Sequence, residues 1–387
     1  MGQYELTEEQ KMLREVVRRL AREKVAPGAA ERDEKEEFHW DMVEILRENE
    51  LFGVDFPVEY GGSGAGTLAF VIVVEELSRV DASVGGTVSY QDLGSLPIIL
   101  AGNEEQKRKY LPLLARGEKL AAFSLTEPKA GSDVAGLGCR AIKKGDEYII
   151  NGTKLFISNG GVADIHTVYA VTNPEEGKPQ RRGSMFIVER GYPGFRVGKK
   201  EKKLGIRSSN TVELIFEDCR VPAENLLGKE GDGFGIAMKT LDFARLGIAA
   251  QAVGIAGGAL EYAVEYAKGR EAFGKPINQF QGVSFKLADM AIKVEAARQL
   301  LYKAASVFQE LPKDMTRLSP EQIRLSSMAK AYCSDVAMEV TVEAVQVLGG
   351  YGYSREYPVE RMMRDAKITQ IYEGTNEIQR LIIANTL

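Results

Sequence analysis

The sequence predicts an α+β protein in which a helical region, a small β region and a second helical region follow one another. Apolar residues recur at helical spacing in residues 1–119, and the same pattern returns over longer stretches in residues 227–387. Between them, residues 120–226 hold short alternating or β-branched runs broken by Gly, Asn and Asp. A chain of 387 residues is long enough for two or three domains, so we expect one domain for each region.

The first region opens with a helix signal. Thr7 and Gln10 have the spacing of a capping box, in which each side chain accepts a hydrogen bond from the backbone N–H of the other residue. Apolar residues follow at helical spacing, and loops rich in Gly and Pro separate one such segment from the next. We expect helices over residues 7–25, 41–50, 67–80 and 104–116.

The second region contains four runs with the residue types and the alternation of β-strands. They cover residues 148–150, 167–171, 185–188 and 211–216. Short runs of this kind, separated by turn residues, are typical of a small and mainly antiparallel β domain.

The third region carries the longest helical periodicity, over residues 234–268, 279–310 and 320–347. A short closing helix is expected after Gly374, because the apolar residues that follow share one stripe. Either Thr375 or Asn376 can cap the first turn of that helix.

Composition and charge exclude several classes of function. The net charge is −5 and the basic residues are mixed with acidic ones, so no nucleic-acid-binding surface is indicated. No apolar run approaches the roughly 20 residues that span a bilayer, and the amino terminus shows a helix signal rather than a signal peptide. We therefore expect a cytoplasmic protein that does not enter a membrane.

Cysteine and histidine are too few and too scattered for a metal site. Cys139, Cys219 and Cys333 are far apart, which suits a reducing compartment and gives no ligand spacing. The two histidines, His39 and His166, stand apart from any cluster of Cys, His or carboxylate residues. We therefore expect no metal and no Ser–His–Asp arrangement.

The most informative segment is residues 371–380. Here Glu373 stands between Tyr372 and Gly374, immediately before the closing helix. A carboxylate held between an aromatic ring and closely approaching backbone is partly desolvated, which raises its pKa toward values suited to a general base. Taken alone, the segment also fits an exposed loop glutamate.

No dinucleotide-binding fingerprint and no phosphate-binding loop is present. Residues 61–66 and 228–235 are rich in glycine, but neither segment follows a predicted strand to give G-x-G-x-x-G. A nucleotide cofactor would therefore be bound without a Rossmann unit.

Five segments, taken in order, resemble the acyl-CoA dehydrogenase family over essentially the whole chain. They are residues 123–133, 151–159, 270–281, 346–352 and 363–367. Each alone is a weak signal, because Gly-Gly and Glu-Pro turns are common, whereas five in the family's order are very specific. The resemblance implies a helical N-terminal domain, a small β domain and a C-terminal four-helix bundle. It also implies FAD as the cofactor and an acyl-CoA as the substrate.

The resemblance further implies two groups of FAD-binding residues. Those near the isoalloxazine ring are Phe123, Leu125, Thr126, Ser132, Phe156, Ile157 and Ser158, with Thr375 and Glu377 after Glu373. Those that reach the dinucleotide end of a neighbouring subunit's FAD are Arg270, Phe273, Gln281, Gln346, Gly349 and Gly350. Because the cofactor would then lie across a subunit interface, we expect a homotetramer.

The residue types fit these implied roles. Thr126 offers a hydroxyl group and backbone amides that suit the N5 and pyrimidine end of a flavin. Phe156 and Ser158 alternate with Ile157, so we expect both to face the flavin, the first by stacking and the second by hydrogen bonding. Arg270 supplies a fixed guanidinium for the pyrophosphate. A plain β-turn after Thr126 and simple strand packing are the structural alternatives.

By the same resemblance, Glu373 removes the α-proton while the β-hydride passes to N5 of FAD, which gives a 2-enoyl-CoA. One subgroup of the family places its catalytic Glu on the helix that here carries Asp242 and Arg245, but residue 244 is alanine, so the base assignment rests on Glu373. The thioester oxygen would be held by the Glu373 backbone N–H and a ribityl hydroxyl of FAD. The implied substrate-binding residues are Ser132, Asp242, Arg245 and Gly374.

Asp92 leaves the substrate class open. It introduces an acid into a region that lines the acyl pocket in the family, where apolar or small polar residues are usual. One interpretation is an aspartate on a helix surface or at an N-cap. The other is a second pocket acid, which acts as an additional or replacement base on a cyclohexane- or cyclohexene-carboxyl-CoA. Since Glu373 is present, ordinary α,β-dehydrogenation of a linear or cyclic acyl group also remains open.

Two further functions fit the same residues. An acyl-CoA oxidase would use them while admitting oxygen to the flavin, and a non-catalytic scaffold would only bind flavin or CoA. For a dehydrogenase, the resemblance implies an electron-transferring flavoprotein as the electron acceptor.

Overall fold

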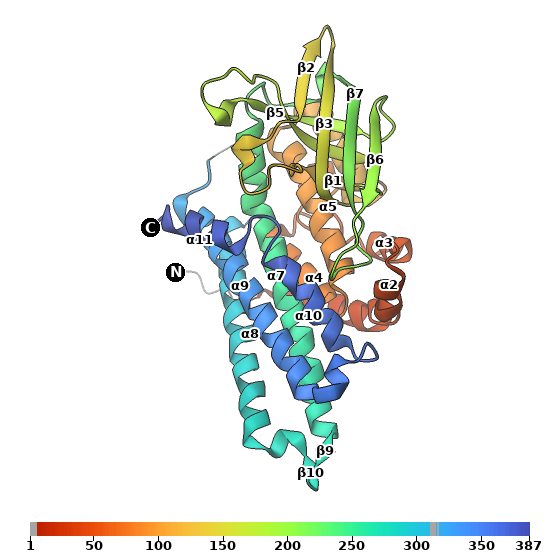
Figure 1. Ribbon diagram of the computed structural model, residues 1–387, viewed down its shortest axis with the longest axis vertical. Coiled ribbons are helices and arrows are strands. Elements are labelled where there is room, and N and C mark those ends of the chain that lie inside the picture. Colours follow the sequence, from red (N-terminus) through yellow and green to blue (C-terminus); the bar gives the residue numbers. More distant parts are fainter. Residues whose placement is uncertain (1–5, 310–314, 316) are drawn as a thin grey trace.

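The computed structural model describes residues 6–309, 315 and 317–387. Its helices and strands follow the predicted order of a helical, a β and a second helical region (Figure 1). The β region forms one end of the elongated molecule, and the hairpin of β9 (Glu271–Ala272) and β10 (Lys275–Pro276) forms the other. The α+β fold class predicted from the sequence is therefore confirmed.

The first region consists of helices that pack side by side. The predicted capping box is present, with Thr7 accepting a hydrogen bond from the backbone N–H of Gln10 and Gln10 accepting one from Thr7. The helix that follows continues into a π-helical turn over Ala21–Val25. The helices are α1 (Glu8–Leu20), α2 (Ala29–Lys35), α3 (Trp40–Glu48), α4 (Gly66–Ser78), α5 (Ala82–Ala101) and α6 (Glu104–Ala115).

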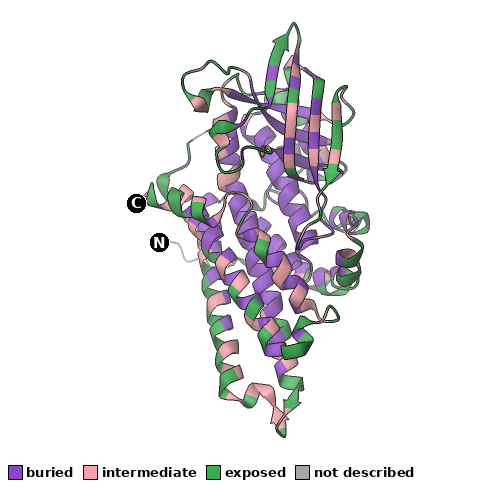
Figure 2. Cartoon of the chain, viewed as in Figure 1, coloured by how far each residue is buried: buried purple, intermediate pink, exposed green. Residues whose placement is uncertain are grey.

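Helix α5 was not expected from the sequence. All of its residues except the last are buried, so it has no polar face and no helical alternation of apolar and polar residues (Figure 2). Three glycines and Pro97 further weaken the sequence signal for a helix. Its N-cap is Asp81, whose side chain accepts hydrogen bonds from the backbone N–H groups of Ser83 and Val84.

The second region is one eight-stranded sheet, in the order β6-β7-β3-β2-β4-β5-β8, with β1 paired to β4. Most neighbours are antiparallel, as predicted, while β1 and β2 run parallel to β4. Its strands are β1 (Ala121–Ser124), β2 (Arg140–Lys144), β3 (Glu147–Ser158), β4 (Ile165–Val171), β5 (Gly183–Glu189), β6 (Phe195–Lys200), β7 (Thr211–Pro222) and β8 (Leu226–Leu227).

A glycine allows helix α5 to pack directly on the sheet. A side chain at Gly94 would come within 2.6 Å of the Ala122 nitrogen, so only a residue without Cβ permits this approach. The Thr167 hydroxyl donates a hydrogen bond to the Gly94 carbonyl at 3.1 Å. The helical and β regions are therefore joined through α5, β1 and β4.

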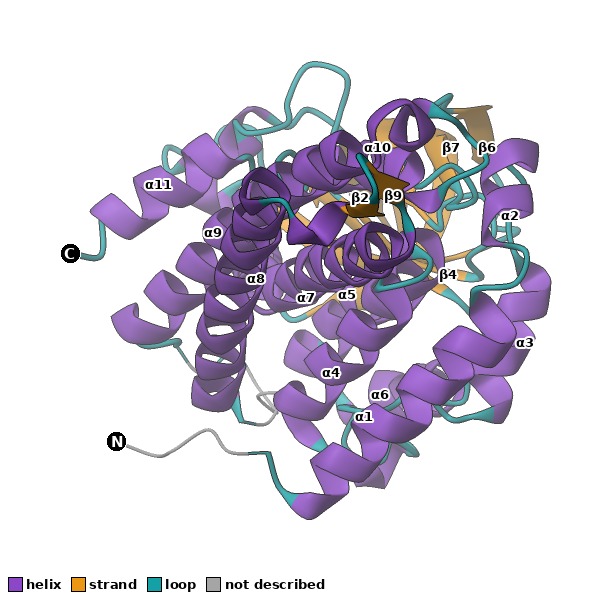
Figure 3. Ribbon diagram, turned by 90° about the horizontal axis from the view of Figure 1, so that it is seen from below, coloured by secondary structure: helices purple, strands orange, loops and turns teal. Residues whose placement is uncertain are grey.

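The third region is a bundle of four helices followed by a short closing helix. Seen from below, α7 and α5 lie between the α8–α9 pair and the helices of the first region (Figure 3). The helices are α7 (Gly233–Gly269), α8 (Gln281–Phe308), α9 (Pro320–Leu348), α10 (Pro358–Thr369) and α11 (Asn376–Ala384). The sequence did not predict α10 as a helix. The last residue of the helix expected over 279–310 lies outside the described residues.

Helix α7 has the length and apolar composition of a membrane span, contrary to our expectation that no segment would approach one. However, 94% of its most apolar 18-residue window is buried inside the protein (Figure 2). Other helices of the fold therefore cover the apolar surface of α7.

A buried acid ties the first region to the bundle. The Glu75 carboxylate of α4 accepts hydrogen bonds from Arg298 Nε and the Tyr302 hydroxyl of α8, each at 2.8 Å. Arg79 adds an ion pair at 3.5 Å. Since Glu75 is only 1% exposed, these partners satisfy a charge that would otherwise be costly to bury.

Candidate active site

Glu373 lies in a tight turn between α10 and α11. Two consecutive residues have left-handed backbone conformations, with φ of +53° at Glu373 and +94° at Gly374. Such a conformation is strained for a residue with a side chain and persists where the surroundings hold it. Thr375 is the N-cap of α11, because its hydroxyl accepts a hydrogen bond from the Ile378 backbone N–H at 3.4 Å.

Two buried side chains hold the carbonyl groups of this turn. Lys330 of α9 donates to the Gly374 carbonyl at 2.7 Å. The Gln379 amide donates to the carbonyls of Glu373 and Gly374, at 3.2 and 3.0 Å. These contacts fix the strained backbone and thereby the direction of the Glu373 side chain.

The Glu373 carboxylate is buried without a hydrogen-bond partner. Neither of its oxygens has one among the described residues. Burial raises its pKa to about 8, although the positive charges of Arg245 and Lys330 act in the opposite direction. The structure therefore contradicts the alternative of an exposed loop glutamate, and this carboxyl group changes charge near neutral pH, as a general base requires.

Aromatic groups form one wall beside Glu373. The rings of Tyr372 and Tyr90 lie edge to face, with centroids 6.4 Å apart. The Tyr372 hydroxyl donates to Gln251, whose amide in turn donates to the Ala82 carbonyl at 2.7 Å. This chain of contacts links the turn to α7 and α5.

Asp92 lies in the middle of α5 and is 3% exposed. The interpretation as a helix-surface or N-cap aspartate is therefore wrong. One of its oxygens, like one of Asp55, has no hydrogen-bond partner among the described residues. Burial, followed by the negative charges of Asp55 and Glu373, raises the pKa of Asp92 well above its ordinary value. Asp92 thus belongs to the same buried set of acids as Glu373.

Helix α7 adds a charged pair at this site. Arg245 is 4% exposed and forms an ion pair with Asp242, one turn earlier. Burial raises the pKa of Asp242 in spite of this partner. The structure brings Arg245 within electrostatic reach of Glu373, so this predicted substrate residue lies near the predicted base, while Asp242 pairs with Arg245.

Most of the predicted flavin-ring residues lie in or after β1 and at the end of β3, whereas Thr375 and Glu377 lie at the start of α11. The Leu155 backbone N–H donates to the Thr126 carbonyl at 2.8 Å, which places Thr126 beside Leu155, the residue before Phe156. A β-bulge between Lys154 and Ile157, with Phe156 at φ +58°, turns the Phe156 ring outward, where it is 59% exposed.

The other residues of this group differ in exposure. Ser158 is half-buried and Ser132 lies exposed in the loop after β1. Phe123, Leu125 and Ile157 are buried in the hydrophobic core. The strict alternation expected for Phe156 and Ser158 is interrupted by the bulge, although Phe156 and Ile157 do face opposite ways.

Helix α5 connects this end of the sheet to the base. Asp92 interacts electrostatically with Glu373, and Gly94, two residues later, packs on Ala121 and Ala122 of β1. Thr126 lies two residues after the end of β1. The buried acids and the exposed Phe156 ring therefore belong to adjacent parts of one site.

The second group of predicted FAD residues lies elsewhere in the chain. Phe273 is 97% exposed at the tip of the β9–β10 hairpin, at the end of the molecule opposite the sheet (Figure 1). Arg270 stacks on the Tyr351 ring, 5.4 Å from its centroid, and its guanidinium has no ion pair among the described residues. A single chain does not bring the two groups together.

An open cavity of about 570 Å³ accompanies this second group. It is lined by Arg270, Gly349, Gly350 and Tyr351, among others. A side chain added at Gly349 or Gly350 would meet nothing within 4 Å, so backbone there is open to a ligand. Gln281 begins α8 and Gln346 lies in the last turn of α9, both exposed.

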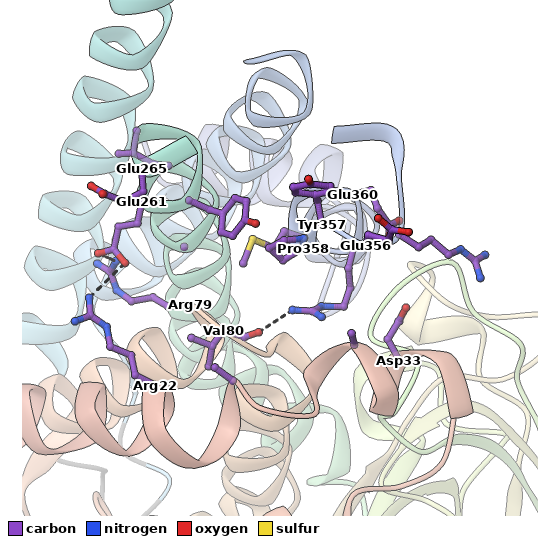
Figure 4. A pocket seen from close by; sticks show the side chains of 18 of the residues that line it. Arg22, Asp33, Arg79, Val80, Glu261, Glu265, Glu356, Tyr357, Pro358 and Glu360 are labelled. Carbon is purple, nitrogen blue, oxygen red and sulfur yellow. Dashed lines mark hydrogen bonds and ion pairs between the residues drawn. The ribbon is translucent and has the colours of Figure 1, made fainter. Parts of the chain in front are cut away.

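A larger cavity, about 920 Å³, lies between the Ala21–Val25 turn, α2, the end of α4, α7 and α10 (Figure 4). None of the predicted site residues lines it. Several of its charged groups have protein partners: Arg79 binds Glu261 at 2.7 Å, and Arg361 donates to the Val80 carbonyl at 3.0 Å. Its size alone therefore does not make it the active site.

Three family models cover nearly the whole chain. The N-terminal, middle and C-terminal domains of acyl-CoA dehydrogenase match residues 7–118, 122–219 and 231–387. The chain belongs to the acyl-CoA dehydrogenase family. It is an oxidoreductase enzyme, so the hypothesis of a non-catalytic flavin- or CoA-binding scaffold is rejected. The domain boundaries that we placed after residues 119 and 226 stay predictions.

Several curated acyl-CoA dehydrogenases are similar over their full length. An acyl-CoA dehydrogenase of Bacillus subtilis is 52% identical, covering 99% of this chain and 98% of the relative. A short-chain-specific enzyme of Clostridium acetobutylicum is 49% identical, with 99% of both chains covered. A cyclohex-1-ene-1-carbonyl-CoA dehydrogenase of Syntrophus aciditrophicus is 48% identical, covering 99% and 91%.

Solved structures agree with this acyl-CoA dehydrogenase fold. Butyryl-CoA dehydrogenase of Megasphaera elsdenii has a TM-score of 0.94 at 48% identity, with 99% of each chain covered. A chain from a study of the electron transferring flavoprotein of Acidaminococcus fermentans has the same TM-score at 49% identity and the same coverage.

The acyl-CoA dehydrogenase family is FAD-dependent, and FAD is the cofactor of this enzyme. An acyl-CoA dehydrogenase of Bacillus anthracis solved with FAD has a TM-score of 0.90 at 38% identity, covering 100% of this chain and 68% of that one. The residues present fit the cofactor: an outward aromatic ring at Phe156, an unpaired guanidinium at Arg270, and open backbone at Gly349 and Gly350.

Sequence reasoning missed four residues of the site. Asp55 lies in an irregular buried segment, and Tyr90 lies on the unpredicted helix α5. Gln251 and Lys330 are single polar residues within otherwise apolar stretches of α7 and α9. The sequence offered one signal for Gln251 and Lys330. Each is a lone polar residue on the apolar stripe of a long helix, and such a residue needs a buried hydrogen-bond partner.

Proposed function

We propose that this enzyme removes hydrogen from the α and β carbons of a short-chain acyl-CoA, with Glu373 as the base that accepts the α-proton. The observation that carries this proposal is the buried Glu373 carboxylate, which has no hydrogen-bond partner among the described residues and a pKa raised to about 8. A base of this kind holds lone pairs free for a substrate C–H and is charged in part of the enzyme population at neutral pH.

The relatives support a short acyl group. The C. acetobutylicum relative is short-chain specific and the M. elsdenii structure is a butyryl-CoA dehydrogenase. The A. fermentans chain supports an electron-transferring flavoprotein as the acceptor of the electrons.

The residues around Glu373 support the proton transfer. No described residue accepts a hydrogen bond from the Glu373 backbone N–H, so this group is available to the thioester oxygen. A donor aimed at that oxygen stabilises the negative charge that develops as the α-proton leaves. Arg245 and Lys330 favour the charged form of the base, and the Tyr90 and Tyr372 rings cover the site on the α5 side.

FAD, when bound, supplies the acceptor for the hydrogen that leaves the β carbon as hydride. Thr126, Phe156 and Ser158 would hold its ring end. Arg270 and the Gly349–Gly350 backbone of a second subunit would hold its dinucleotide end, since these residues lie at the opposite end of one chain (Figure 1). This separation supports a homotetramer in which each cofactor contacts two subunits.

Anaerobic reduction of the purified holoenzyme by butyryl-CoA tests the proposal. We expect rapid bleaching of the flavin absorbance in the parent, and retained FAD with no bleaching in Glu373→Gln. Glu105→Gln, at an exposed position of α6, is the control and should bleach like the parent. Substantial bleaching of Glu373→Gln would overturn the base assignment.

A second candidate substrate is an alicyclic acyl-CoA. It is favoured by Asp92, a buried acid with an unpartnered oxygen that interacts with Glu373, and by the similarity to the S. aciditrophicus enzyme. Under this alternative, Asp92 removes a ring proton that Glu373 does not reach, either beside Glu373 or in its place.

A panel of butyryl-, octanoyl-, cyclohexanecarboxyl- and cyclohexenecarboxyl-CoA distinguishes the two candidates. Rapid reduction by butyryl-CoA with no reduction by the cyclic thioesters supports the first proposal. Reduction by the cyclic thioesters alone supports the second. Oxygen consumption in place of electron transfer to a flavoprotein would instead identify an acyl-CoA oxidase.

A further inference from the structure

Lys330 is a completely buried lysine that touches the turn of the proposed base. It lies on α9, with 0% of its surface exposed. Its ammonium group donates to the Gly374 carbonyl at 2.7 Å and to Asn376 Oδ1 at 2.9 Å. A buried lysine is rare in proteins, because removing its charge from water is costly.

The partners of Lys330 are themselves held in place. The Asn376 amide donates to the Ser334 hydroxyl at 2.9 Å and to the Asp335 carboxylate at 2.8 Å. Both partners lie on α9, one turn after Lys330. The ammonium therefore joins the rigid core helix α9 to residues 374–376, which immediately follow Glu373.

Several charged groups face this pair. Glu373, Asp335 and Glu377 attract the Lys330 ammonium, whereas Arg245 of α7 repels it. Arg245 also faces Glu373, and from α5 Asp92 is within electrostatic reach of that carboxylate. Burial lowers the pKa of Lys330, and the Glu373 carboxylate is the largest influence that favours its ammonium form.

The charges of Lys330 and Glu373 depend on each other. A positive Lys330 favours the carboxylate form of Glu373, and the carboxylate in turn favours the ammonium form of Lys330. The carboxylate is the form that can accept a proton from a substrate. Removal of the lysine charge should therefore leave more of the base protonated at neutral pH.

The backbone gives Lys330 a second effect. Glu373 and Gly374 both have left-handed φ angles, and an unsupported turn of this kind would relax. Lys330 and Gln379 share the Gly374 carbonyl as acceptor, so they hold the turn from two sides.

We propose that Lys330 is a positioning residue of the dehydrogenation, which holds the Glu373 turn through the Gly374 carbonyl and favours the charged form of the Glu373 base. This inference rests on the proposed role of Glu373. Lys330 itself contacts the turn and need not touch the substrate or the cofactor.

The test is anaerobic stopped-flow reduction of the holoenzyme by butyryl-CoA between pH 6 and pH 9.5. Lys330→Met removes the charge and the donor, and Lys330→Gln removes the charge but keeps a donor. In both, we expect the pH at which the rate rises to move upward by about one unit, which is about a tenfold loss below that pH. The substrate concentration for half-maximal rate should stay near that of the parent.

Two further variants complete the design. Lys330→Arg keeps the charge and should keep the parent pH profile, even where its maximal rate is lower. Ser334→Ala removes a neutral hydrogen bond from the same cluster and should leave the pH profile unmoved. If Lys330→Met fails to retain FAD, Lys330→Gln and Lys330→Arg carry the comparison.

Two outcomes distinguish a failure of the proposed role of Lys330 from a failure of the proposed function of Glu373. A parent-like pH profile in Lys330→Gln, with Glu373→Gln inactive, overturns the role of Lys330 and leaves the base in place. Reduction of the flavin by Glu373→Gln overturns the proposed function itself, and the role of Lys330 with it.

Discussion

Asp55 and Asp92 place two carboxyl groups in one buried environment, at 5% and 3% exposure. Each group leaves one oxygen without a hydrogen-bond partner among the described residues. Burial is the largest cause that raises the pKa of Asp92, and the negative charge of Asp55 is the second largest. Burial also raises the pKa of Asp55 itself, to about 7. Two such acids cannot both be charged cheaply, so the pair retains a proton near neutral pH.

The first prediction concerns stability and pH. Unfolded Asp55 releases its proton near 3.8, whereas folded Asp55 keeps it up to about 7. The free energy of unfolding should therefore fall as pH rises through this window, since the unfolded state then binds fewer protons. The Asp55→Asn variant lacks this carboxyl group, so its free energy of unfolding should fall less than that of the parent on going to pH 8, by on the order of 2–4 kcal/mol.

Urea unfolding at pH 5 and pH 8, at one protein concentration, measures this effect. Asp146→Asn, at an exposed turn, is the control and should follow the parent. Equal pH dependence in the parent and Asp55→Asn would show that Asp55 is charged in the folded state at both pH values.

The second prediction concerns the pH dependence of catalysis. Because protonated Glu373 cannot accept a proton and its pKa in the free enzyme is about 8, kcat/KM for butyryl-CoA should rise with pH. The rise should be about tenfold per pH unit below this value and should level off above it. Initial rates with an artificial electron acceptor measure it. A flat profile from pH 6 to pH 9 would contradict the assignment.

The third prediction separates the roles of the two pocket acids. Asp92→Asn keeps the size of the side chain and removes its ability to act as a base. We expect less than about a threefold change in the rate with butyryl-CoA. If the alicyclic alternative holds, the rate with cyclohexenecarboxyl-CoA should fall by about 100-fold or more, the usual contribution of a general base. Equal losses with both substrates would instead indicate that Asp92 only supports the fold.

The fourth prediction concerns the contact between α5 and the sheet. In Gly94→Ala the added methyl group would lie within 2.7 Å of Ala121 and Ala122, so α5 or β1 must shift. We expect a loss of about 2–3 kcal/mol in the free energy of unfolding. Flavin reduction should also slow, because a shift of β1 would displace the predicted flavin residue Thr126 that follows it. Gly177→Ala, where nothing lies within 4 Å, is the matched control. A variant as stable as the parent would contradict the close packing.

The fifth prediction concerns the exposed tip of the hairpin. Phe273 is 97% exposed, so Phe273→Ala should not destabilise an isolated chain. If this hairpin contacts the cofactor of a neighbouring subunit, the variant should lose FAD and shift toward smaller species in size-exclusion chromatography. Val58→Ala, at a position that is 70% exposed in the first region, should do neither. Unchanged FAD content in Phe273→Ala would remove the hairpin from the cofactor site.

Local patterns in the sequence predicted the elements with a clear polar face and the proposed base. The Thr7–Gln10 capping box and the strand runs are local signals, and the structure contains them. Glu373 stood out because Tyr372 and Gly374 flank it. The sequence could not choose between Thr375 and Asn376 as the N-cap, and the structure shows Thr375 in that role while Asn376 binds Lys330.

The rest of the site depends on contacts between distant segments. The sequence left Asp92 open between a helix-surface residue and a pocket acid, because nothing nearby in the sequence shows that helices and strands cover all sides of α5. Asp55 and Lys330 gain their chemistry from neighbours that are 37 and more residues away. The periodicity of apolar residues predicts a helix only where one face of the helix is exposed and polar. A helix that is buried on all sides has no such periodicity and cannot be predicted in this way.

The burial of α5 has a consequence for the order in which the site forms. With three glycines, a proline and several β-branched residues, α5 has little tendency to form a helix alone. It should therefore gain its structure only when the surrounding helices and β1 are already docked. Its backbone amides should then exchange with solvent deuterium only through global opening of the protein. The wall that carries Asp92 would be among the last parts of the native state to form, and it would be lost only when the whole protein unfolds.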